Sequence, residues 1–343
     1  MNTFKNIRIA DIIPETKDTK TFVLECDEPI QYKAGQFLSF IFKKRHGEER
    51  RSYSFSSAPG LAEPLAITVK RVANGEFSRL FTDKVRVGEH FRVIGPSGFF
   101  TIPEDFGNTK QIFFLAAGSG ITPVFSLIKW LLHFKPHLKL VLLYSNHAEK
   151  EIIFRNALNK LVAEYPDQFR MEYLLSISPK LERARMSKWL LSVLLQEYRE
   201  VALHEMLFYL CGPFDYMRMV TIQLLNEGLL PSQIRKENFS IFKPVIRAIP
   251  PDMEKRRVEI HIDGRVYHIE TQYPDSILAA AKKKGITLPY SCEAGRCGTC
   301  VARCLEGTVW MSYNEVLMDD EIEKGRVLTC VGYPVGGDVK LEF

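Results

Sequence analysis

The sequence predicts a multidomain protein of three units: an antiparallel β-barrel at residues 1–103, an α/β unit with a parallel sheet at residues 108–240, and an α+β unit at residues 257–343. Three observations predict this division. The chain has 343 residues, and a domain usually takes about 100–200 residues. The pattern of apolar runs changes after residue 103 and again after residue 256. Pro244, Pro250 and Pro251 remove backbone donors, which predicts a semi-rigid linker at residues 241–256.

The first unit contains short β-branched and aromatic runs separated by glycine and proline. These runs lie at residues 21–24, 36–40 and 65–69. Such a pattern is typical of antiparallel strands joined by tight turns. We therefore expect the strands of residues 1–103 to form a small barrel.

The second unit alternates apolar runs with helical stretches. The apolar runs lie at residues 111–115, 140–144, 170–175 and 206–210. Strands that alternate with helices form parallel sheets with both faces covered. The third unit returns to a pattern of strands, with one helix expected around residues 276–284.

The composition excludes several classes of function. The formal net charge is +5, and lysine and arginine form no stripe of the kind that binds nucleic acid. No apolar run approaches the ~18 residues that a membrane span needs, and the first residues lack the apolar segment of a signal peptide. We therefore expect no nucleic-acid partner, no membrane span and a cytoplasmic location.

A cluster of cysteines lies in the last fifth of the chain. Thiols in a reducing compartment more often bind metal or do redox chemistry than form disulfides. Three of these cysteines have the spacing C-x4-C-x2-C and a fourth follows at a distance, which is the plant-type [2Fe-2S] pattern. The four predicted ligands are Cys292, Cys297, Cys300 and Cys330.

The loop that carries this pattern must be tight enough to place three thiolates on one small cluster. Gly295 and Gly298 supply the backbone freedom for such a loop. A structural zinc site is the alternative, but such sites usually combine two C-x2-C-like pairs and one is present here. Cys304 lies close by and is expected to be a small buried apolar residue.

A second candidate site follows a predicted strand at Arg51, Tyr53 and Ser54. A guanidinium can hold a pyrophosphate with two hydrogen bonds, a tyrosine ring can pack against a flavin, and a hydroxyl can reach a ring nitrogen. The polar end of an ordinary strand is the alternative.

A glycine turn further along leads into the start of a predicted helix, which is a place where phosphates bind. The candidate residues there are Val69, Lys70, Gly75, Phe77 and Ser78. Residues 95–100 form a tight turn that ends the first unit.

A third candidate site lies after the strands of the parallel sheet. Glycines at a strand-to-helix turn allow a dinucleotide to approach the backbone, although a proline replaces the last glycine of the usual fingerprint. A purely structural turn is the alternative. The candidate residues are Gly118, Ser119, Gly120, Thr122 and Pro123 after the first strand, and Cys211, Gly212 and Pro213 after the fourth.

These motifs resemble known families. Residues 292–300 with residues 328–330 resemble plant-type ferredoxins, and the acidic run at residues 319–323 resembles the acidic face that ferredoxins present to partners, with an ordinary solvated surface as the alternative. The sites in the first two units resemble the flavin and nicotinamide domains of the ferredoxin reductase family. In this order they resemble the reductase components of multicomponent oxygenases, such as phenylacetyl-CoA epoxidase and ketosteroid hydroxylase reductases. The resemblance implies a β-grasp fold for the last unit, and it implies FAD, a [2Fe-2S] cluster and NADH or NADPH as cofactors.

The resemblance also implies residue roles. Arg51 would hold the FAD pyrophosphate, Tyr53 would lie at the isoalloxazine or ribityl side, and Ser54 would lie near the flavin nitrogen that accepts hydride. Thr122 would lie near both flavin and nicotinamide, and Cys211 near the nicotinamide, with an inert buried thiol as the alternative for Cys211.

Two further sets of residues take their interpretation from the same resemblance. Phe239 would cover the flavin, with Glu237 beside it, and a core aromatic is the alternative for Phe239. Relatives often carry arginine at the position of His147, and Lys180, Arg183 and Arg185 could contact a ribose phosphate or coat a helix. The choice between NADH and NADPH therefore stays open, as do the roles of Glu237, Cys26 and Cys304.

The implied activity is an oxidoreductase in which electrons pass from NAD(P)H through FAD and the cluster to a protein acceptor. That acceptor would be an oxygenase, hydroxylase or desaturase component. Two alternatives remain: a ferredoxin/flavodoxin-NAD(P) reductase that uses an external carrier, and a non-enzymatic redox sensor.

Overall fold

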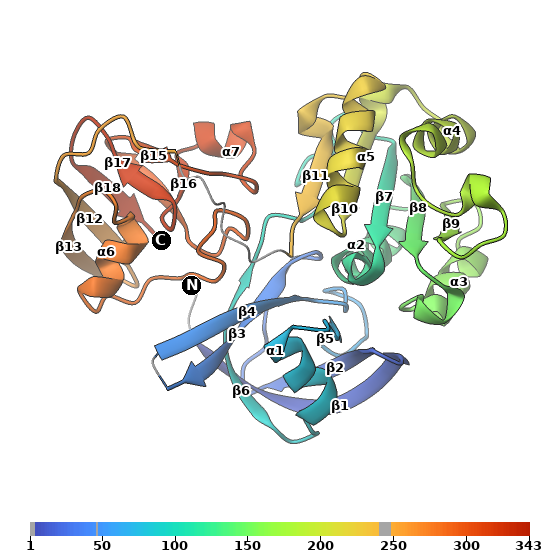
Figure 1. Cartoon of the computed structure of the whole chain (residues 1–343), viewed down its shortest axis with the longest axis horizontal. Coiled ribbons are helices and arrows are strands. Elements are labelled where there is room, and N and C mark those ends of the chain that lie inside the picture. Colours follow the sequence, from blue (N-terminus) through green and yellow to red (C-terminus); the bar gives the residue numbers. More distant parts are fainter. Residues whose placement is uncertain (1–3, 46, 240–247) are drawn as a thin grey trace.

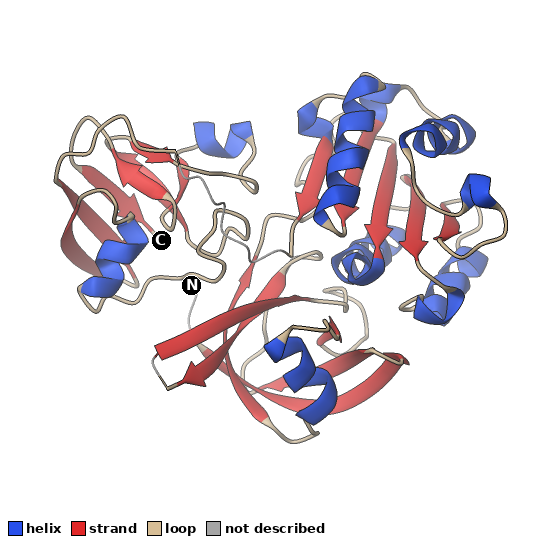
Figure 2. Ribbon diagram, in the orientation of Figure 1, coloured by secondary structure: helices blue, strands red, loops and turns tan. Residues whose placement is uncertain are grey.

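The computed structural model describes residues 4–45, 47–239 and 248–343, so residues 241–247 of the predicted linker lie outside the described residues. Three large sheets occupy successive parts of the chain, and a two-stranded ladder accompanies the third (Figures 1 and 2). The predicted multidomain fold class is confirmed. In the part of the chain that is described, no helix is both long and apolar enough to cross a bilayer.

The first sheet has six antiparallel strands in the order β4-β3-β6-β1-β2-β5. Their bounds are β1 Lys5–Thr16, β2 Thr19–Cys26, β3 Phe37–Lys44, β4 Gly47–Ser54, β5 Ala66–Lys70 and β6 His90–Ser97. The two outer strands meet, because Phe55 pairs with Ile67 and the Ser56 amide donates to the Ala66 carbonyl at 2.9 Å. This contact closes the sheet, as the barrel prediction requires, around a core rich in aromatic side chains.

The second sheet has five parallel strands in the order β11-β10-β7-β8-β9. The strands are β7 Gln111–Ala117, β8 Lys139–Asn146, β9 Phe169–Leu175, β10 Met206–Cys211 and β11 Ile234–Glu237, and the helices are α2 Ile121–Phe134, α3 Arg155–Glu164, α4 Lys188–Tyr198 and α5 Phe214–Asn226. One apolar core lies on each face of the sheet, formed with α2 and α3 on one side and with α4 and α5 on the other. The predicted parallel sheet is confirmed, and β11 adds a short strand that the apolar pattern did not predict.

The C-terminal domain combines a five-stranded mixed sheet, in the order β13-β12-β18-β14-β16, with a two-stranded ladder. Its elements are β12 Arg256–Ile262, β13 Arg265–Thr271, α6 Ile277–Lys283, β14 Val301–Glu306, β15 Val309–Met311, α7 Asp319–Glu323, β16 Arg326–Leu328, β17 Gly332–Pro334 and β18 Val339–Glu342. Helix α6 confirms the predicted helix, and the Ser276 hydroxyl caps it by accepting a hydrogen bond from the Ala279 amide. The first helical turn thereby satisfies one of its free amides.

Candidate functional site

The sulfur atoms of the four predicted cluster ligands meet in two pairs. Cys297 donates a hydrogen bond to Cys292, and Cys330 donates one to Cys300. Three of the four thiols are buried and Cys292 is partly buried. Among the described residues, no group of three or more cysteine, histidine, aspartate or glutamate side chains is placed to hold a single metal ion. Two thiol pairs suit a cluster of two irons that takes four cysteine ligands.

Backbone amides of the same loop point at the first sulfur. The Ala294 amide donates to Cys292 Sγ at 3.4 Å, and the amides of Arg296 and Cys297 also donate to it. The hydrogen bond from the Cys297 thiol, and then these amides, lower the pKa of Cys292 to about 6. The loop is therefore built to stabilise a thiolate, which is the form that binds metal.

The glycine prediction for this loop is confirmed. Gly295 and Gly298 have φ values of +71° and +72°, in the left-handed region that glycine adopts without strain. A Cβ on Gly295 would lie 2.7 Å from the Tyr313 carbonyl oxygen, and a Cβ on Gly298 would lie 2.6 Å from the ring of Phe99. Phe99 belongs to the turn that ends the barrel domain, so the cluster loop packs directly against that domain.

The structure brings the two parts of the predicted flavin site together. The guanidinium of Arg51, on β4, lies 4.6 Å from the ring centroid of Phe77, in the short helix α1 (Glu76–Arg79). The Ser78 hydroxyl accepts from the Val72 amide at 3.1 Å and donates to the Gly75 carbonyl at 3.1 Å, which fixes the turn before that helix. Arg51 also donates to Glu49 at 2.7 Å. A cation and a glycine turn thus share one corner of the barrel.

The other predicted flavin residues lie around this corner. The Tyr53 ring packs on Phe81 at 4.9 Å, and burial raises the pKa of its hydroxyl. Ser54 is buried at the end of β4. The Val69 side chain lies in the barrel core, and Lys70 forms an ion pair with Asp18 at 3.7 Å.

The two predicted nicotinamide segments touch one another. A Cβ on Gly120 would lie 2.0 Å from the Cys211 carbonyl oxygen and 2.9 Å from the Gly212 nitrogen, so the residues after β7 and β10 are in backbone contact. Gly118 has a φ of +54°, and its carbonyl accepts a hydrogen bond from the Tyr144 hydroxyl at 2.9 Å.

The remaining residues of these segments follow the same turn. Ser119 lies in the single 3-10 turn before α2, and Thr122 and Pro123 lie buried in the first turn of α2. Pro213 occupies the N-cap position of α5. All these segments lie at the carboxyl ends of the strands. The strand order reverses between β7 and β10, because β8 and β9 follow β7 on one side and β10 and β11 lie on the other. In α/β sheets, ligands bind at such a switch point.

Cys211 and Glu237 are neighbours in the sheet and both are buried. Burial, together with the nearby carboxyl of Glu237, raises the pKa of the Cys211 thiol. Burial, together with Cys292, raises the pKa of Glu237 to about 8. The thiol is therefore held neutral, and Glu237 lies close enough to Cys292 of the cluster loop for the two groups to interact electrostatically.

A second contact links the same two regions. Arg296, in the cluster loop, pairs with Glu315 at 3.1 Å, and the Asn238 amide donates to Glu315 at 2.9 Å. Phe239, the residue predicted to cover the flavin, follows directly and is 45% exposed. An aromatic side chain with this exposure has surface available for a ligand.

Among the basic residues considered for a ribose phosphate, Arg183 is already engaged. It donates to Glu172 at 2.9 Å and also pairs with Glu197, and these carboxylates raise its pKa. His147, Lys180 and Arg185 are exposed.

The two remaining cysteines have partners of their own. Cys304 donates to the Glu306 carbonyl at 3.4 Å, and Cys26 donates to the Asn6 carbonyl at 3.4 Å. Cys304 is partly exposed on β14 rather than fully buried, which differs from the expected buried position because β14 turns this side chain toward the Glu306–Gly307 turn.

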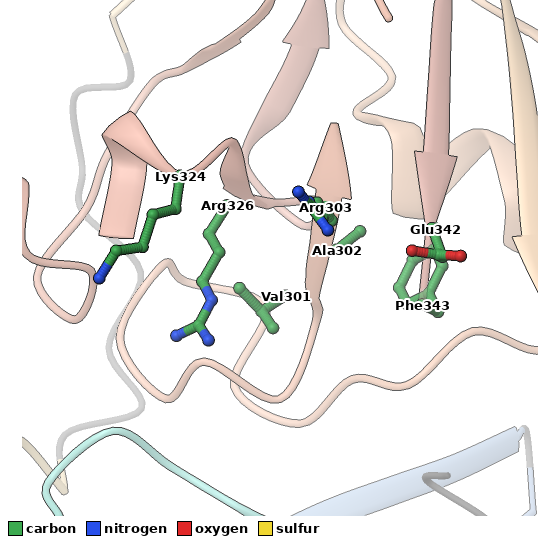
Figure 3. Close-up of a pocket in the computed structure, with 7 residues that line it drawn as sticks. All are labelled: Val301, Ala302, Arg303, Lys324, Arg326, Glu342 and Phe343. Atoms are coloured by element: carbon green, nitrogen blue, oxygen red, sulfur yellow. The ribbon is translucent and has the colours of Figure 1, made fainter. Parts of the chain in front are cut away.

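A pocket of about 480 Å³ opens on the C-terminal domain (Figure 3). Its lining residues are Val301, Ala302, Arg303, Lys324, Arg326, Glu342 and Phe343. The pocket contains none of the predicted site residues. Lys324 and Arg326 lie near Glu104. The pKa of Glu104 is lowered mainly by its hydrogen bond with Lys33, and to a smaller extent by the charges of Lys324 and Arg326.

Some residues at the site were not identified from the sequence. Arg50 and Ser52 of β4 contact Tyr290 and Ser291, directly before the first cluster cysteine. The sequence offered one signal for them, since both β4 residues lie inside or next to the predicted flavin motif. Glu315 carried no such signal, because Arg296 and Asn238, which its carboxylate contacts, lie in other parts of the chain.

Comparisons with protein families match each domain. A family model described as an oxidoreductase FAD-binding domain matches residues 6–102. An oxidoreductase NAD-binding domain matches residues 114–221, and a 2Fe-2S iron-sulfur cluster binding domain matches residues 260–335.

Several curated proteins are similar over almost their whole length. The ferredoxin reductase component of 3-ketosteroid-9-alpha-monooxygenase from Rhodococcus rhodochrous is 31% identical, over 98% of this chain and 96% of that protein. One of the subunits of 1,2-phenylacetyl-CoA epoxidase from Escherichia coli (strain K12) is 30% identical, over 100% of this chain and 98% of that protein.

Solved structures share the fold. Phthalate dioxygenase reductase superposes with a TM-score of 0.60 at 23% identity, over 99% of this chain and 98% of its own. An intact type IV self-sufficient cytochrome P450 monooxygenase superposes with a TM-score of 0.71 at 19% identity, and the match covers 98% of this chain but 41% of that larger protein.

Proposed function

The chain belongs to the family of oxygenase reductase components that combine FAD-, NAD- and [2Fe-2S]-binding domains, and from this premise we propose that it passes electrons from NADH or NADPH to a partner oxygenase. Its class of activity is that of an NAD(P)H oxidoreductase. One observation supports the relay most directly: Ser52, between the flavin-site residues Arg51 and Tyr53, hydrogen-bonds Ser291 beside Cys292 at 2.9 Å. Strand β4 therefore carries residues of the candidate flavin site and also contacts the candidate cluster loop.

The residues present fit two of the cofactors, FAD and the cluster. Arg51 with the Gly75–Ser78 turn offers a cation and a tight backbone turn to a pyrophosphate. The paired thiols of Cys292 with Cys297 and of Cys300 with Cys330 offer the four ligands of a [2Fe-2S] cluster. When bound, FAD and the cluster would supply the redox chemistry: acceptance of a hydride, with its two electrons, from the nicotinamide, and onward transfer of these electrons one at a time.

The protein's own part in this reaction is to bind, orient and exclude water. In our proposal Ser54 would lie near the flavin nitrogen that accepts hydride, Tyr53 would lie at the isoalloxazine or ribityl side, and Phe239 would cover the flavin. Thr122, at the buried start of α2, would lie near both flavin and nicotinamide. Cys211 would lie near the nicotinamide as a neutral thiol, because burial raises its pKa. No side chain needs to act as a strong acid or base.

Three finer statements belong to the same proposal. The protein works in the cytoplasm, where reduced thiols are available for cluster assembly. Its domains are residues 1–103, 108–240 and 257–343, joined by a linker at residues 241–256. Its partner is the oxygenase, hydroxylase or desaturase component of a system in which the oxygen chemistry occurs on the partner.

The test is an anaerobic visible spectrum of the purified protein, recorded before and after NADH or NADPH is added. We expect flavin and iron-sulfur bands that both bleach, with the faster nucleotide identifying the preferred donor. The matched variant Cys300→Ala should keep the flavin bands and their bleaching but lose the iron-sulfur bands. Absent flavin bands, or a cluster that never bleaches, would contradict the relay and favour a redox sensor. Faster turnover with free ferredoxin or flavodoxin than with an oxygenase would favour an external carrier.

A further inference from the structure

Arg50 is buried at the contact between the barrel domain and the C-terminal domain. Its side chain is 2% exposed. Its Nη1 donates to the Tyr290 carbonyl at 2.9 Å, and its Cζ lies 3.6 Å from the centroid of the Tyr290 ring. A buried guanidinium without such partners would be strongly destabilising, so this contact holds the Tyr290 backbone to β4.

The same contact extends to both sides of the first cluster cysteine. Ser52 hydrogen-bonds Ser291 at 2.9 Å, directly before Cys292. Lys282 lies 3.4 Å from the centroid of the Tyr290 ring and pairs at 2.9 Å with Glu293, directly after Cys292. A shift of Tyr290 would therefore be passed to the residues on either side of this cysteine.

Strand β4 presents its two faces to two different sites. Successive side chains of a strand point to opposite faces, so Arg50 and Ser52 face the C-terminal domain while Arg51 and Tyr53 face the candidate flavin corner. Figure 1 shows β4 on the side of the barrel domain nearest the C-terminal domain. The positions of the two sites are therefore fixed by alternate residues of one strand.

We propose that Arg50 is a positioning residue, which docks the residues 290–293 on β4 and so sets the distance between the cluster and the flavin. This inference rests on the proposed function. The step that it controls moves one electron from the flavin reduced by NAD(P)H to one ferric ion of the cluster, and no covalent bond forms or breaks. The protein's contribution to such a step is the placement of the cofactors.

The test compares Arg50→Gln and Arg50→Lys with the control Arg92→Gln in the cofactor-loaded protein. Arg92 is a matched control because it contacts Glu48 at 3.6 Å and the Phe4 ring at 3.9 Å, two barrel-domain partners that it shares with Arg50, at 3.8 and 5.8 Å. Arg92→Gln therefore disturbs the shared contacts but not the one with Tyr290. Anaerobic stopped-flow absorbance separates flavin bleaching by NAD(P)H from the later bleaching of the cluster. We expect Arg50→Gln to leave flavin bleaching unchanged and to slow cluster bleaching at least about tenfold, since small misplacements of reacting groups have effects of this size.

Further readouts separate docking from a general structural role. Arg50→Lys should fall between wild type and Arg50→Gln, and Arg92→Gln should match wild type. Hydrogen exchange of residues 288–293 should speed up in Arg50→Gln, while the EPR spectrum of the dithionite-reduced cluster stays unchanged. If Arg50→Gln does not assemble with its cofactors, Ser52→Ala removes one hydrogen bond of the same contact and should also slow cluster bleaching.

Three results would overturn the inference: unchanged cluster bleaching, equal slowing of both steps, or an altered EPR spectrum. A wild-type cluster that is never reduced through the flavin would instead overturn the proposed function, so the two failures are distinguishable.

Discussion

Gly120 packs against the carbonyl end of Cys211, so closely that a Cβ at position 120 would lie 2.0 Å from the Cys211 oxygen and 2.4 Å from its carbonyl carbon. Both are backbone atoms of β10 and cannot rotate away. The contact joins the segments after β7 and β10, which are neighbouring strands at the centre of the sheet. Glycine at position 120 is therefore required by the packing of these two segments.

The substitution Gly120→Ala should impair use of the nicotinamide nucleotide. The added methyl group must push the two segments apart, and we expect the KM for NAD(P)H to rise at least about tenfold. Steady-state reduction of an artificial acceptor measures this effect. The matched control is Gly337→Ala, where a Cβ would meet no atom within 4 Å. An unchanged KM in Gly120→Ala would show that the nucleotide does not bind at this contact.

Arg51→Gln should weaken the binding of FAD. Hydrogen bonds to charged groups contribute about 1.5–3 kcal/mol each, so the Kd for FAD should rise by roughly tenfold to a hundredfold. Titration of the flavin-stripped protein with FAD, followed by flavin fluorescence, measures the constant. Arg8→Gln on β1 is the control, because Arg8 forms an exposed pair with Glu25 and surface pairs contribute little. Equal FAD affinities in the two variants would argue against a pyrophosphate on Arg51.

Cys330→Ala and Cys304→Ala should differ in their iron content. Cys330 shares a hydrogen bond with Cys300, whereas Cys304 donates to a backbone carbonyl. We expect Cys330→Ala to lose the iron, the sulfide and the iron-sulfur absorbance, and Cys304→Ala to retain all three. Chemical assay of iron and sulfide per chain measures the difference. Loss of iron from Cys304→Ala as well would place this cysteine in the cluster site.

Local patterns predicted much of this molecule because they act over a few residues. Short segments predicted the strands of the barrel and of the parallel sheet. They also predicted the helix capped by Ser276 and the tight loop in which Gly295 and Gly298 have positive φ values. The acidic run at residues 319–323, which resembles the acidic face of ferredoxins, forms helix α7 in the structure. The start of this helix is held by the Met318 amide, which donates to Glu321 at 3.2 Å.

The contacts between domains could not be predicted in this way. Arg50 and Tyr290 are 240 positions apart, and neither side chain has a local pattern that names its partner. The same holds for Glu315, which accepts a hydrogen bond from Asn238 and forms an ion pair with Arg296, both in other segments of the chain. Such pairs depend on how completed domains fit together, and no spacing or periodicity records that fit.

The buried carboxyl of Glu237 should make the free energy of unfolding decrease as the pH rises. Burial, and then the neighbouring Cys292, raise its pKa to about 8 from the ordinary value of 4.5. A bound cluster with four thiolates carries net negative charge and acts in the same direction. The folded protein therefore holds the Glu237 proton more tightly than the unfolded chain does. The contribution of this protonated carboxyl to the free energy of unfolding is complete below pH 4.5 and falls as the pH rises from 4.5 to about 8.

The variant Glu237→Gln should remove this dependence, because glutamine stays neutral throughout. Between pH 5 and pH 8 the unfolding free energy of wild type relative to Glu237→Gln should fall by up to about 1.4 kcal/mol per pH unit, and it should level off at higher pH. Urea unfolding of the cofactor-loaded proteins at several pH values measures the difference, in which the titration of groups that do not interact with residue 237 cancels. Glu25→Gln, which replaces an exposed carboxylate paired with Arg8, is the control for the effect of a surface Glu→Gln substitution on unfolding. A flat difference for Glu237→Gln would mean that the carboxyl is already ionised in the folded protein and has a cationic or hydrogen-bonding partner that offsets its burial.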